Sequence, residues 1–397
     1  MSFQTLEHKV LSNISQEDVI KLTQELVAMP TENPPADYER ISKFIAQAYS
    51  MLGLEVKIIS GQAGKPNVCG RWVGDGTSQE TLMLSGHMDV VPAGEGWKHD
   101  PFQAVLEGNQ LLGRGTADMK GALAAQIIAV RALREAGVKP KGTLYLCATV
   151  DDEIAGPMGL RYVINEGLDK LGWPKPTFHL LGEPSNLNLF TAFKGRIWVK
   201  LTVGGQSAHG GNPAAGINAI EKMAAFIQDI LQFERQAHPL MGVDTINIGT
   251  IQGGEKTNIV PDQCSVTIDY RFVAPQTSVD IEHRILEAIE RMKGKDPQFT
   301  LKEFSVFERR DPREVPQNNP YLVSLKSLTE EITMKNAAFA GVLSAGDAYW
   351  TLSAGIPAVF YGPGSLSVAH TNKEFVPVDE LVAAAKIFAL YTLRTVS

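Results

Sequence analysis

The order of apolar segments limits the fold of this chain more than any other feature of its sequence. Amphipathic helical patterns alternate with short apolar strand patterns through the first half of the chain. The helical patterns cover residues 16–29, 38–52 and 121–136, and the strand patterns cover 54–60, 67–72, 81–85, 143–150 and 177–181. Strands that alternate with helices indicate a largely parallel sheet with helices on both faces. We therefore predict an α/β fold with a mostly parallel central sheet and flanking helices.

A different order of elements occupies residues 194–307. A strand, a helix, two strands, a second helix and a last strand are predicted there, at 196–205, 217–235, 245–254, 264–273, 278–293 and 299–306. This β-α-β-β-α-β order is that of the ferredoxin-like unit, and its length fits a small domain. We predict that this α+β domain is inserted into a larger domain made of residues 1–193 and 308–397, whose first residues around His8 are loose.

The composition is that of an ordinary globular protein. Hydrophobic residues make up 44% of the chain and charged residues 20%, which argues against a disordered chain. The formal net charge of -7 argues against nucleic acid or an anionic membrane surface as the main partner. We expect a cytoplasmic protein, because the sequence has neither a secretory signal pattern nor an apolar run that approaches a membrane span.

Polar side chains that can bind a metal ion follow several of the predicted strands. In open α/β sheets, ligands bind beyond the carboxyl ends of the strands, so these side chains are expected at one edge of the sheet. Asp118 differs from the others, because it precedes a helix in a glycine-broken loop. The candidate ligands are His87, Asp118, Asp152, Glu153, Glu183 and His370.

Each candidate also has a simpler explanation when it is taken alone. Asp118 could cap the helix that follows it, the acidic run 151–153 could be a solvated loop, and Glu183 could cap a turn before Pro184. Together these explanations would have to coincide at one sheet edge. Histidines among several carboxylates, without cysteine, suit zinc, cobalt or manganese. We therefore favour a metal site.

Six motifs together resemble the di-zinc metallopeptidase family, which includes acetylornithine deacetylase, succinyl-diaminopimelate desuccinylase, glutamate carboxypeptidase and aminoacylase. The motifs are SGHMDVVP, GRGTADMKG, DDE, LGEPS, GGQSAHGGNPAAGINAI and AHTNKEF. The resemblance covers nearly the whole chain, including the inserted block. It implies a zinc-peptidase-like catalytic domain and an inserted domain that serves as lid and dimer contact.

The resemblance also implies which residue holds which ion. Asp118 would bridge two divalent metal ions per subunit, with zinc as the first choice and cobalt or manganese as alternatives. His87 and Glu183 would complete the protein ligands of one ion. Glu153 and His370 would complete those of the other.

Five further residues have catalytic or substrate-binding roles by the same resemblance. Asp152 occupies the position of the general base, where the family usually has glutamate, so the side chain here is one methylene shorter. Asp89 would orient the histidine two residues before it. His209 would stabilise the oxyanion, often from the partner subunit, and Asn258 and Arg271 would contact the substrate, with Arg271 binding a carboxylate. A capping or core histidine and a packed strand arginine are the simpler alternatives for His209 and Arg271.

The implied activity is hydrolysis of the amide bond of N-acyl amino acids by a dimeric di-metal amidohydrolase. An exopeptidase of the glutamate-carboxypeptidase or dipeptidase type would use the same ligands, so this alternative stays open. A catalytically silent metal-binding protein also stays open, because of Asp152. The expected partners are a small N-acyl amino acid or short peptide and a second copy of the chain, without nucleic acid or membrane.

Overall fold

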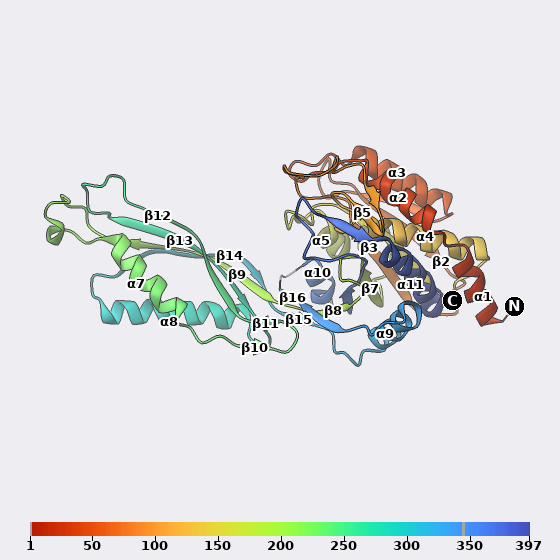
Figure 1. Cartoon of the computed structure of the whole chain (residues 1–397). Coiled ribbons are helices and arrows are strands. Elements are labelled where there is room, and N and C mark those ends of the chain that lie inside the picture. Colours follow the sequence, from red (N-terminus) through yellow and green to blue (C-terminus); the bar gives the residue numbers. More distant parts are fainter. Residues whose placement is uncertain (1, 344–345) are drawn as a thin grey trace. The chain divides into compact units, whose positions relative to one another are not determined.

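The computed structural model describes residues 2–343 and 346–397. Contacts between Cα atoms divide the chain into two compact units. The larger unit comprises the described residues of Met1–Thr191, Val315–Ala340 and Asp347–Ser397, and the inserted unit comprises those of Ala192–Glu314 and Gly341–Gly346. In Figure 1 most of the inserted unit is coloured green to cyan, whereas the larger unit has the colours of both ends of the chain.

The main sheet has the strand order β1-β2-β6-β3-β7-β17-β8-β15, and β16 pairs with β8. Its strands are β1 (Glu55–Ile59), β2 (Asn67–Val73), β3 (Thr81–His87), β6 (Thr143–Thr149), β7 (Phe178–Leu181), β8 (Leu189–Phe193), β15 (Arg313–Glu314), β16 (Phe339–Val342) and β17 (Ala358–Phe360). The four central strands, β6, β3, β7 and β17, pair in parallel. The predicted α/β fold with a mostly parallel central sheet is confirmed.

The edges of this sheet are antiparallel, which the strand patterns did not indicate. β1 pairs antiparallel with β2, and β2 pairs antiparallel with β6. The connection between β1 and β2, residues 60–66, contains no helix, whereas parallel neighbours need a long crossover. A hairpin is therefore the arrangement that this short connection allows.

Helices cover the main sheet and bury its apolar side chains. They are α1 (Phe3–Ser12), α2 (Gln16–Val27), α3 (Glu39–Met51), α4 (Lys120–Ala136), α5 (Leu160–Tyr162), the π-helix η1 (Val163–Gly167), α6 (Leu168–Leu171), α9 (Pro320–Thr333), α10 (Ala348–Ser353) and α11 (Val378–Val396). The central helix α4 is rich in alanine and leucine, is buried on nearly every face and packs against α2, α11 and β3. It ends at Gly137, whose left-handed φ of 81° a residue with a side chain rarely adopts.

The expectation of a loose N-terminus is wrong. Residues 3–12 form helix α1, whose first turn is capped by the Ser2 side chain accepting a hydrogen bond from the backbone N–H of Thr5. Val10 is fully buried, and the Lys9 ammonium donates to the carbonyl of Ala136 at the end of α4. Packing on α4 therefore stabilises a helix too short to be stable alone.

The inserted unit has the predicted β-α-β-β-α-β order. Its elements are β9 (Gly195–Gly204), the 3-10 turn η2 (Pro213–Ala215), α7 (Ala219–Leu231), the short hairpin β10 (Ala237–His238) and β11 (Gly242–Val243), β12 (Thr245–Gly253), β13 (Gln263–Phe272), α8 (Ser278–Lys295) and β14 (Thr300–Arg310). The sheet order is β12-β13-β9-β14, and every pairing is antiparallel. Alternate residues of β9 and β13 are buried beneath α7 and α8 and form a separate core.

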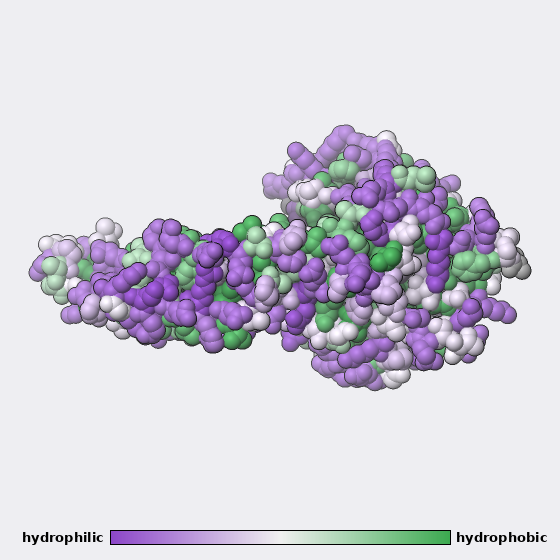
Figure 2. Space-filling model, turned by 90° about the horizontal axis from the view of Figure 1, so that it is seen from below, coloured by the Kyte–Doolittle hydropathy of each residue, from purple (hydrophilic) through white to green (hydrophobic). Residues whose placement is uncertain are grey.

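A second, small sheet of the larger unit was not predicted. It is made of β4 (Val105–Glu107), β5 (Gln110–Leu112) and β18 (Phe375–Pro377), and it ties the chain after residue 370 to the segment before residue 118. The surface in Figure 2 is largely hydrophilic with scattered apolar residues. Within the described ranges, no helix has both the length and the apolar character that crossing a membrane requires.

Candidate metal centre

Three parallel strands deliver polar side chains to one edge of the main sheet. His87 is the last residue of β3 and lies opposite Thr149, the last residue of β6. The acidic run 151–153 follows β6 after Val150, and Glu183 follows β7 after one glycine. Because the carboxyl ends of parallel strands share one edge, these side chains lie close together, as the sequence predicted.

Asp118 lies between two histidines from distant parts of the chain. Its Oδ1 is 3.0 Å from Nε2 of His87, and its Oδ2 is 3.2 Å from Nε2 of His370. The two oxygens of one carboxylate therefore face two different imidazoles. This is the arrangement that a carboxylate bridging two metal ions requires.

The remaining carboxylates divide between the two histidines. Glu183 Oε1 is 3.8 Å from Nε2 of His87, and Glu153 Oε2 is 3.0 Å from Nε2 of His370. Asp152 Oδ2 is 4.0 Å from Nε2 of His87, and its ligand atom lies within 4.8 Å of those of His87 and Glu183. Two donor groups result, His87 with Asp152 and Glu183 and His87 with Asp118 and Glu153, which share His87, and Asp118 also faces His370.

The charge of this cluster fits two divalent cations. Four carboxylates converge on the two imidazoles, those of Asp118, Asp152, Glu153 and Glu183. The side chains of His87, Asp118, Glu153 and Glu183 are buried by more than nine-tenths, whereas Asp152 is partly exposed and His370 is exposed. Buried anions at such density need positive charge close by. Imidazole and carboxylate donors without thiolate suit zinc, cobalt or manganese.

The pKa values reflect this crowding of charges. Burial raises the pKa of the Asp118 carboxyl, but hydrogen bonds from His370 and His87 outweigh it and leave the pKa below its ordinary value. Hydrogen bonds to Asp118 and Glu153 raise the pKa of His370 to about 10. Burial and the negative charge of Asp118 raise the pKa of Glu153 to about 6, and burial with the charge of Asp152 raises that of Glu183.

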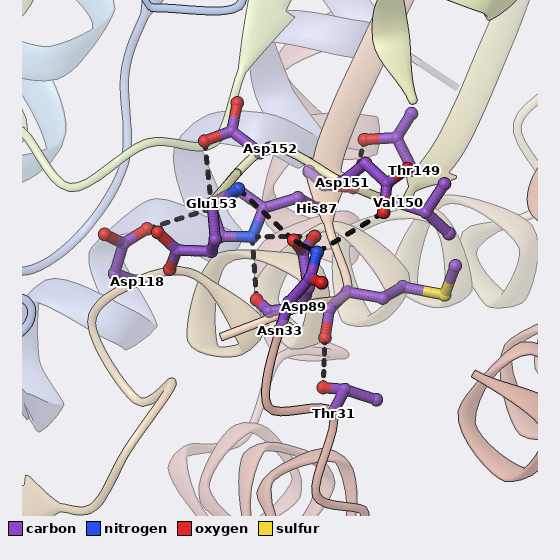
Figure 3. Close-up of polar contacts among 12 residues, drawn as sticks. Thr31, Asn33, His87, Asp89, Asp118, Thr149, Val150, Asp151, Asp152 and Glu153 are labelled. Carbon is purple, nitrogen blue, oxygen red and sulfur yellow. Dashed lines mark hydrogen bonds and ion pairs between the residues drawn. The ribbon is translucent and has the colours of Figure 1, made fainter. Parts of the chain in front are cut away.

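Asp89 positions His87 through its backbone. Nδ1 of His87 lies 2.8 Å from the carbonyl oxygen of Asp89, whereas the Asp89 carboxylate is 3.7 Å away. A carbonyl can only accept, so Nδ1 carries a proton, and Nε2 is the ring nitrogen that faces the carboxylates and could bind a metal ion. The Asp89 carboxylate instead accepts hydrogen bonds from the Asn33 amide at 2.8 Å and from the backbone N–H of Glu153 at 3.2 Å (Figure 3).

Glu374 and Arg114 are supporting residues that the sequence reasoning missed. One oxygen of the fully buried Glu374 accepts from the backbone N–H groups of Gly115, Ala117 and Asp118 at 2.9, 3.1 and 3.1 Å, and the other pairs with the guanidinium of Arg114. Glu374 thereby fixes the loop that carries the bridging carboxylate. Both residues stand inside motifs noted above, GRGTADMKG and AHTNKEF, but nothing in their spacing indicates that they meet.

Comparison with known sequences identifies the family. Residues 83–394 match peptidase family M20/M25/M40. The chain belongs to this family. It is therefore a hydrolase of amide or peptide C–N bonds whose reaction depends on metal ions, which confirms the class of enzyme that the motifs predicted.

Relatives from the M20/M25/M40 family carry several specific names. N-formyl-4-amino-5-aminomethyl-2-methylpyrimidine deformylase of Bacillus subtilis is 29% identical, with 94% of this chain and 93% of that protein covered. Acetylornithine deacetylase of Vibrio atlanticus is 28% identical, with 86% and 87% covered. A probable succinyl-diaminopimelate desuccinylase of Staphylococcus epidermidis is 25% identical, with 94% and 97% covered.

Solved structures of two peptidases share the fold. The aminopeptidase PepT of Bacillus cereus superposes with a TM-score of 0.81 at 22% identity, covering 96% of this chain and 99% of that one. A dinuclear metal-binding peptidase of Bacillus subtilis gives a TM-score of 0.72 at 16% identity, covering 96% and 98%. The candidate metal centre described above thus lies in a fold that holds two metal ions in another M20 enzyme.

Three of the predicted site residues belong to the inserted unit, whereas the metal cluster belongs to the larger one. His209 and Asn258 lie in neighbouring exposed loops, where the N–H of Gly210 donates to the carbonyl of Asn258 at 2.8 Å. Nδ1 of His209 accepts from the N–H of Gly211 at 3.0 Å. Arg271, on β13, holds Asp269 through Nε and Nη2 at 3.2 and 3.1 Å.

Proposed function

We propose that this M20/M25/M40 enzyme hydrolyses the amide bond of N-acyl amino acids, as the names acetylornithine deacetylase and succinyl-diaminopimelate desuccinylase among its relatives suggest. The observation that carries the proposal is Asp118 shared between His87 and His370, with Asp152 beside the cluster. We propose two ions per subunit, zinc first and cobalt or manganese as alternatives, and a cytoplasmic homodimer.

In this proposal the ligands are those predicted from the motifs. His87, Asp118 and Glu183 would hold one ion, and Asp118, Glu153 and His370 the other. Bound divalent ions supply Lewis acidity, which makes water acidic enough to react near neutral pH and polarises a carbonyl group.

Asp152 takes the proton of the attacking water and returns it to the departing amine. Its carboxylate lies beside the ligand cluster and is 24% exposed, so it is more available to solvent than the carboxylates proposed as ligands. Asp89 orients His87 through the carbonyl contact at 2.8 Å.

The inserted unit supplies the remaining groups. His209 donates to the oxyanion, and Arg271 and Asn258 contact the substrate. The unit also serves as lid and dimer contact, so that closure completes the site. In the proposed dimer, the His209 that donates to the oxyanion can belong to the partner subunit.

His209→Ala is expected to lower kcat by roughly two to three powers of ten, the usual loss for one oxyanion donor. The hydrogen bond from Gly211 to Nδ1 is local, so the variant should keep the melting temperature of the wild type. Steady-state kinetics and thermal melting test both statements. His283→Ala, on α8 of the same unit, is the matched control and should leave kcat unchanged. An unchanged kcat in His209→Ala would mean that this histidine is structural.

Arg271→Ala is expected to raise KM for substrates with a free carboxylate more than for the corresponding carboxamides. The physical reason is that a guanidinium binds a carboxylate through two parallel hydrogen bonds, which an amide cannot match. The hydrogen bond from Arg271 to the carboxylate of Asp269 keeps the guanidinium ordered before the substrate binds. KM ratios for matched acid and amide substrates give the measurement, with Arg291→Ala on α8 as a control cation. Equal changes for acid and amide would exclude the carboxylate role.

An exopeptidase is the alternative function, because the same ligands and the same base cleave a peptide bond. The deciding experiment is amine release by the metal-loaded protein from matched N-acetyl, N-succinyl and N-aroyl amino acids and dipeptides. Hydrolysis of one acyl class, lost on chelation and restored by metal, supports the deacylase. Preference for dipeptides supports the exopeptidase. Inactivity on every substrate with two metal ions bound would favour a metal-binding protein without catalysis.

A further inference from the structure

The loop that carries Asp152 and Glu153 begins at a residue in an unusual backbone conformation. Asp151 has a φ of 63°, in the left-handed region that residues with side chains rarely adopt. Its side chain is buried, with 3% exposure. Such a conformation persists only where surrounding contacts hold it, so the contacts of Asp151 decide how the next two side chains are aimed.

Three side chains from distant segments contact the Asp151 carboxylate, all at Oδ1. The ammonium of Lys65 donates at 2.6 Å, the Tyr38 hydroxyl lies at 3.2 Å and the Asn33 amide at 3.3 Å. Lys65 comes from the connection between β1 and β2, and its side chain is only 17% exposed. Its ammonium also lies 5.3 Å from the centre of the Tyr38 ring, which adds a cation–π contact.

Asn33 extends these contacts to the histidine-bearing loop. Its amide nitrogen also donates to Oδ2 of Asp89 at 2.8 Å, and the same oxygen accepts from the backbone N–H of Glu153 at 3.2 Å. Figure 3 shows Asn33 between the loop of His87 and Asp89 and the loop of Asp151. A continuous chain of contacts thus runs from Lys65 through Asp151 and Asn33 to both ligand-bearing loops.

Lys65 supplies positive charge to this series of contacts. Asp89 and Asp151 are buried carboxylates beside an already acidic cluster, and Lys65 is a cation in direct contact with one of them. Removing one partner of a buried ion pair leaves the other uncompensated, which is strongly unfavourable. Without Lys65 the carboxylate of Asp151 would turn toward solvent, and the backbone of the next two residues would move with it.

We infer that Lys65 is a positioning residue, which acts through Asp151 to hold Asp152 and Glu153 in place. For Asp152 the inference rests on the proposed function as general base. For Glu153 it requires only that this residue binds metal. A base must come within hydrogen-bond reach of the proton that it removes, and the short aspartate side chain makes its backbone position more critical than glutamate would.

The test compares Lys65→Met and Lys65→Arg as full-length, metal-loaded protein. Lys65→Met should lower kcat by about ten- to a hundredfold, the scale of a misplacement near 1 Å, with little change in KM. It should also weaken Co²⁺ binding by about ten- to a hundredfold, the usual loss for a residue that supports a ligand. Cobalt titration followed by visible absorption reports this second effect without any substrate. Lys65→Arg keeps the charge and should restore most of both properties.

Glu55→Gln is the matched control. It breaks the Glu55–Arg71 pair on the same β1–β2 hairpin, at 2.6 Å in the wild type, and should leave kcat and cobalt affinity unchanged. Wild-type kcat and cobalt affinity in Lys65→Met, with only a lower melting temperature, would overturn the inference. Should Lys65→Met fail to fold, Lys65→Gln removes the positive charge beside Asp151 but keeps a polar side chain at this partly exposed position. Unchanged kcat and cobalt affinity in that variant would equally overturn it.

The two proposals fail in different ways. A wild-type protein that hydrolyses no amide would defeat the proposed function. Cobalt affinity would still decide whether Lys65 positions Glu153, because that measurement needs no turnover. Active wild type with normal cobalt affinity and normal kcat in Lys65→Met would defeat the inference alone.

Discussion

Asp152→Asn is expected to lower kcat by about two to four powers of ten, the usual contribution of a general base, and to leave KM nearly unchanged. Asparagine has almost the same size as aspartate but cannot accept the proton of the attacking water. The carboxylate lies 4.0 Å from Nε2 of His87, so the change removes a proton acceptor at the edge of the cluster and no close contact within it. A loss in kcat without a change in KM means that the missing interaction exists only in the transition state.

Metal analysis and a second substitution complete this test. Asp152→Asn should still bind two ions, since the five proposed ligands are intact. Asp152→Glu should stay within about a hundredfold of the wild type, because it keeps the acid chemistry and changes only the reach. Glu135→Gln, on an exposed part of α4, serves as the control for a lost surface charge. If Asp152→Asn turns over at the wild-type rate, Asp152 is not the base.

Asp118→Ala is expected to abolish measurable hydrolysis and to remove the stabilisation that metal gives. Its two oxygens lie 3.0 and 3.2 Å from His87 and His370, so both ions would lose a ligand at once. Losing several kcal/mol of charge stabilisation in the transition state corresponds to roughly three powers of ten in rate or more. Asp118→Asn keeps the shape of the side chain but binds metal ions more weakly. Its rate of hydrolysis and its stabilisation by metal should lie between those of the wild type and those of Asp118→Ala.

Thermal melting with and without added zinc measures the second effect. A ligand present at about a thousand times its Kd stabilises the folded state by about 4 kcal/mol, so the wild type should melt at a higher temperature with zinc than with a chelator. Asp118→Ala should show little difference between the two conditions. A full zinc-dependent shift in this variant would mean that the ions bind elsewhere. Asp379→Ala, at the start of α11, is a control for loss of an exposed carboxylate.

The strand and helix patterns predicted the fold in the segments where apolar residues repeat with the spacing of either a helix or a strand. The alternation before residue 181 predicted the parallel centre, and the order after residue 194 predicted the inserted unit. Strand direction at the sheet edge could not be predicted from apolar runs, because an isolated run of five to seven residues looks the same in either direction. Helix α1 was missed although Phe3, Leu6 and Val10 recur at helical spacing; it is short and is stabilised by packing on α4.

The sequence predicted where the candidate ligands lie, but it did not predict the residues that hold the ligand-bearing loops in place. His87, Glu153 and Glu183 end or follow strands with a common edge, so their position in the chain implies their position in space, whereas Asp118 lies in a loop before a helix. Lys65 and Asn33 lie in loops without such a constraint, and their contacts with Asp151 depend on tertiary structure alone. Asp89 was predicted to orient His87, but the histidine contacts its backbone carbonyl, a choice that no side-chain pattern encodes.

The connection between the two units has a consequence for protein engineering. The chain leaves the larger unit after Thr191 and returns at Val315, and the N–H of Val315 donates to the carbonyl of Thr191 at 2.9 Å. For the larger unit, everything between these residues is a loop with adjacent ends. Closing such a gap needs only a short linker, and the entropy of closing a loop grows slowly with its length. Exchanging segment 192–314 between relatives, together with the described residues of Gly341–Gly346 that belong to the same unit, would transfer whatever specificity the unit carries while the donor atoms around Asp118 keep their own scaffold.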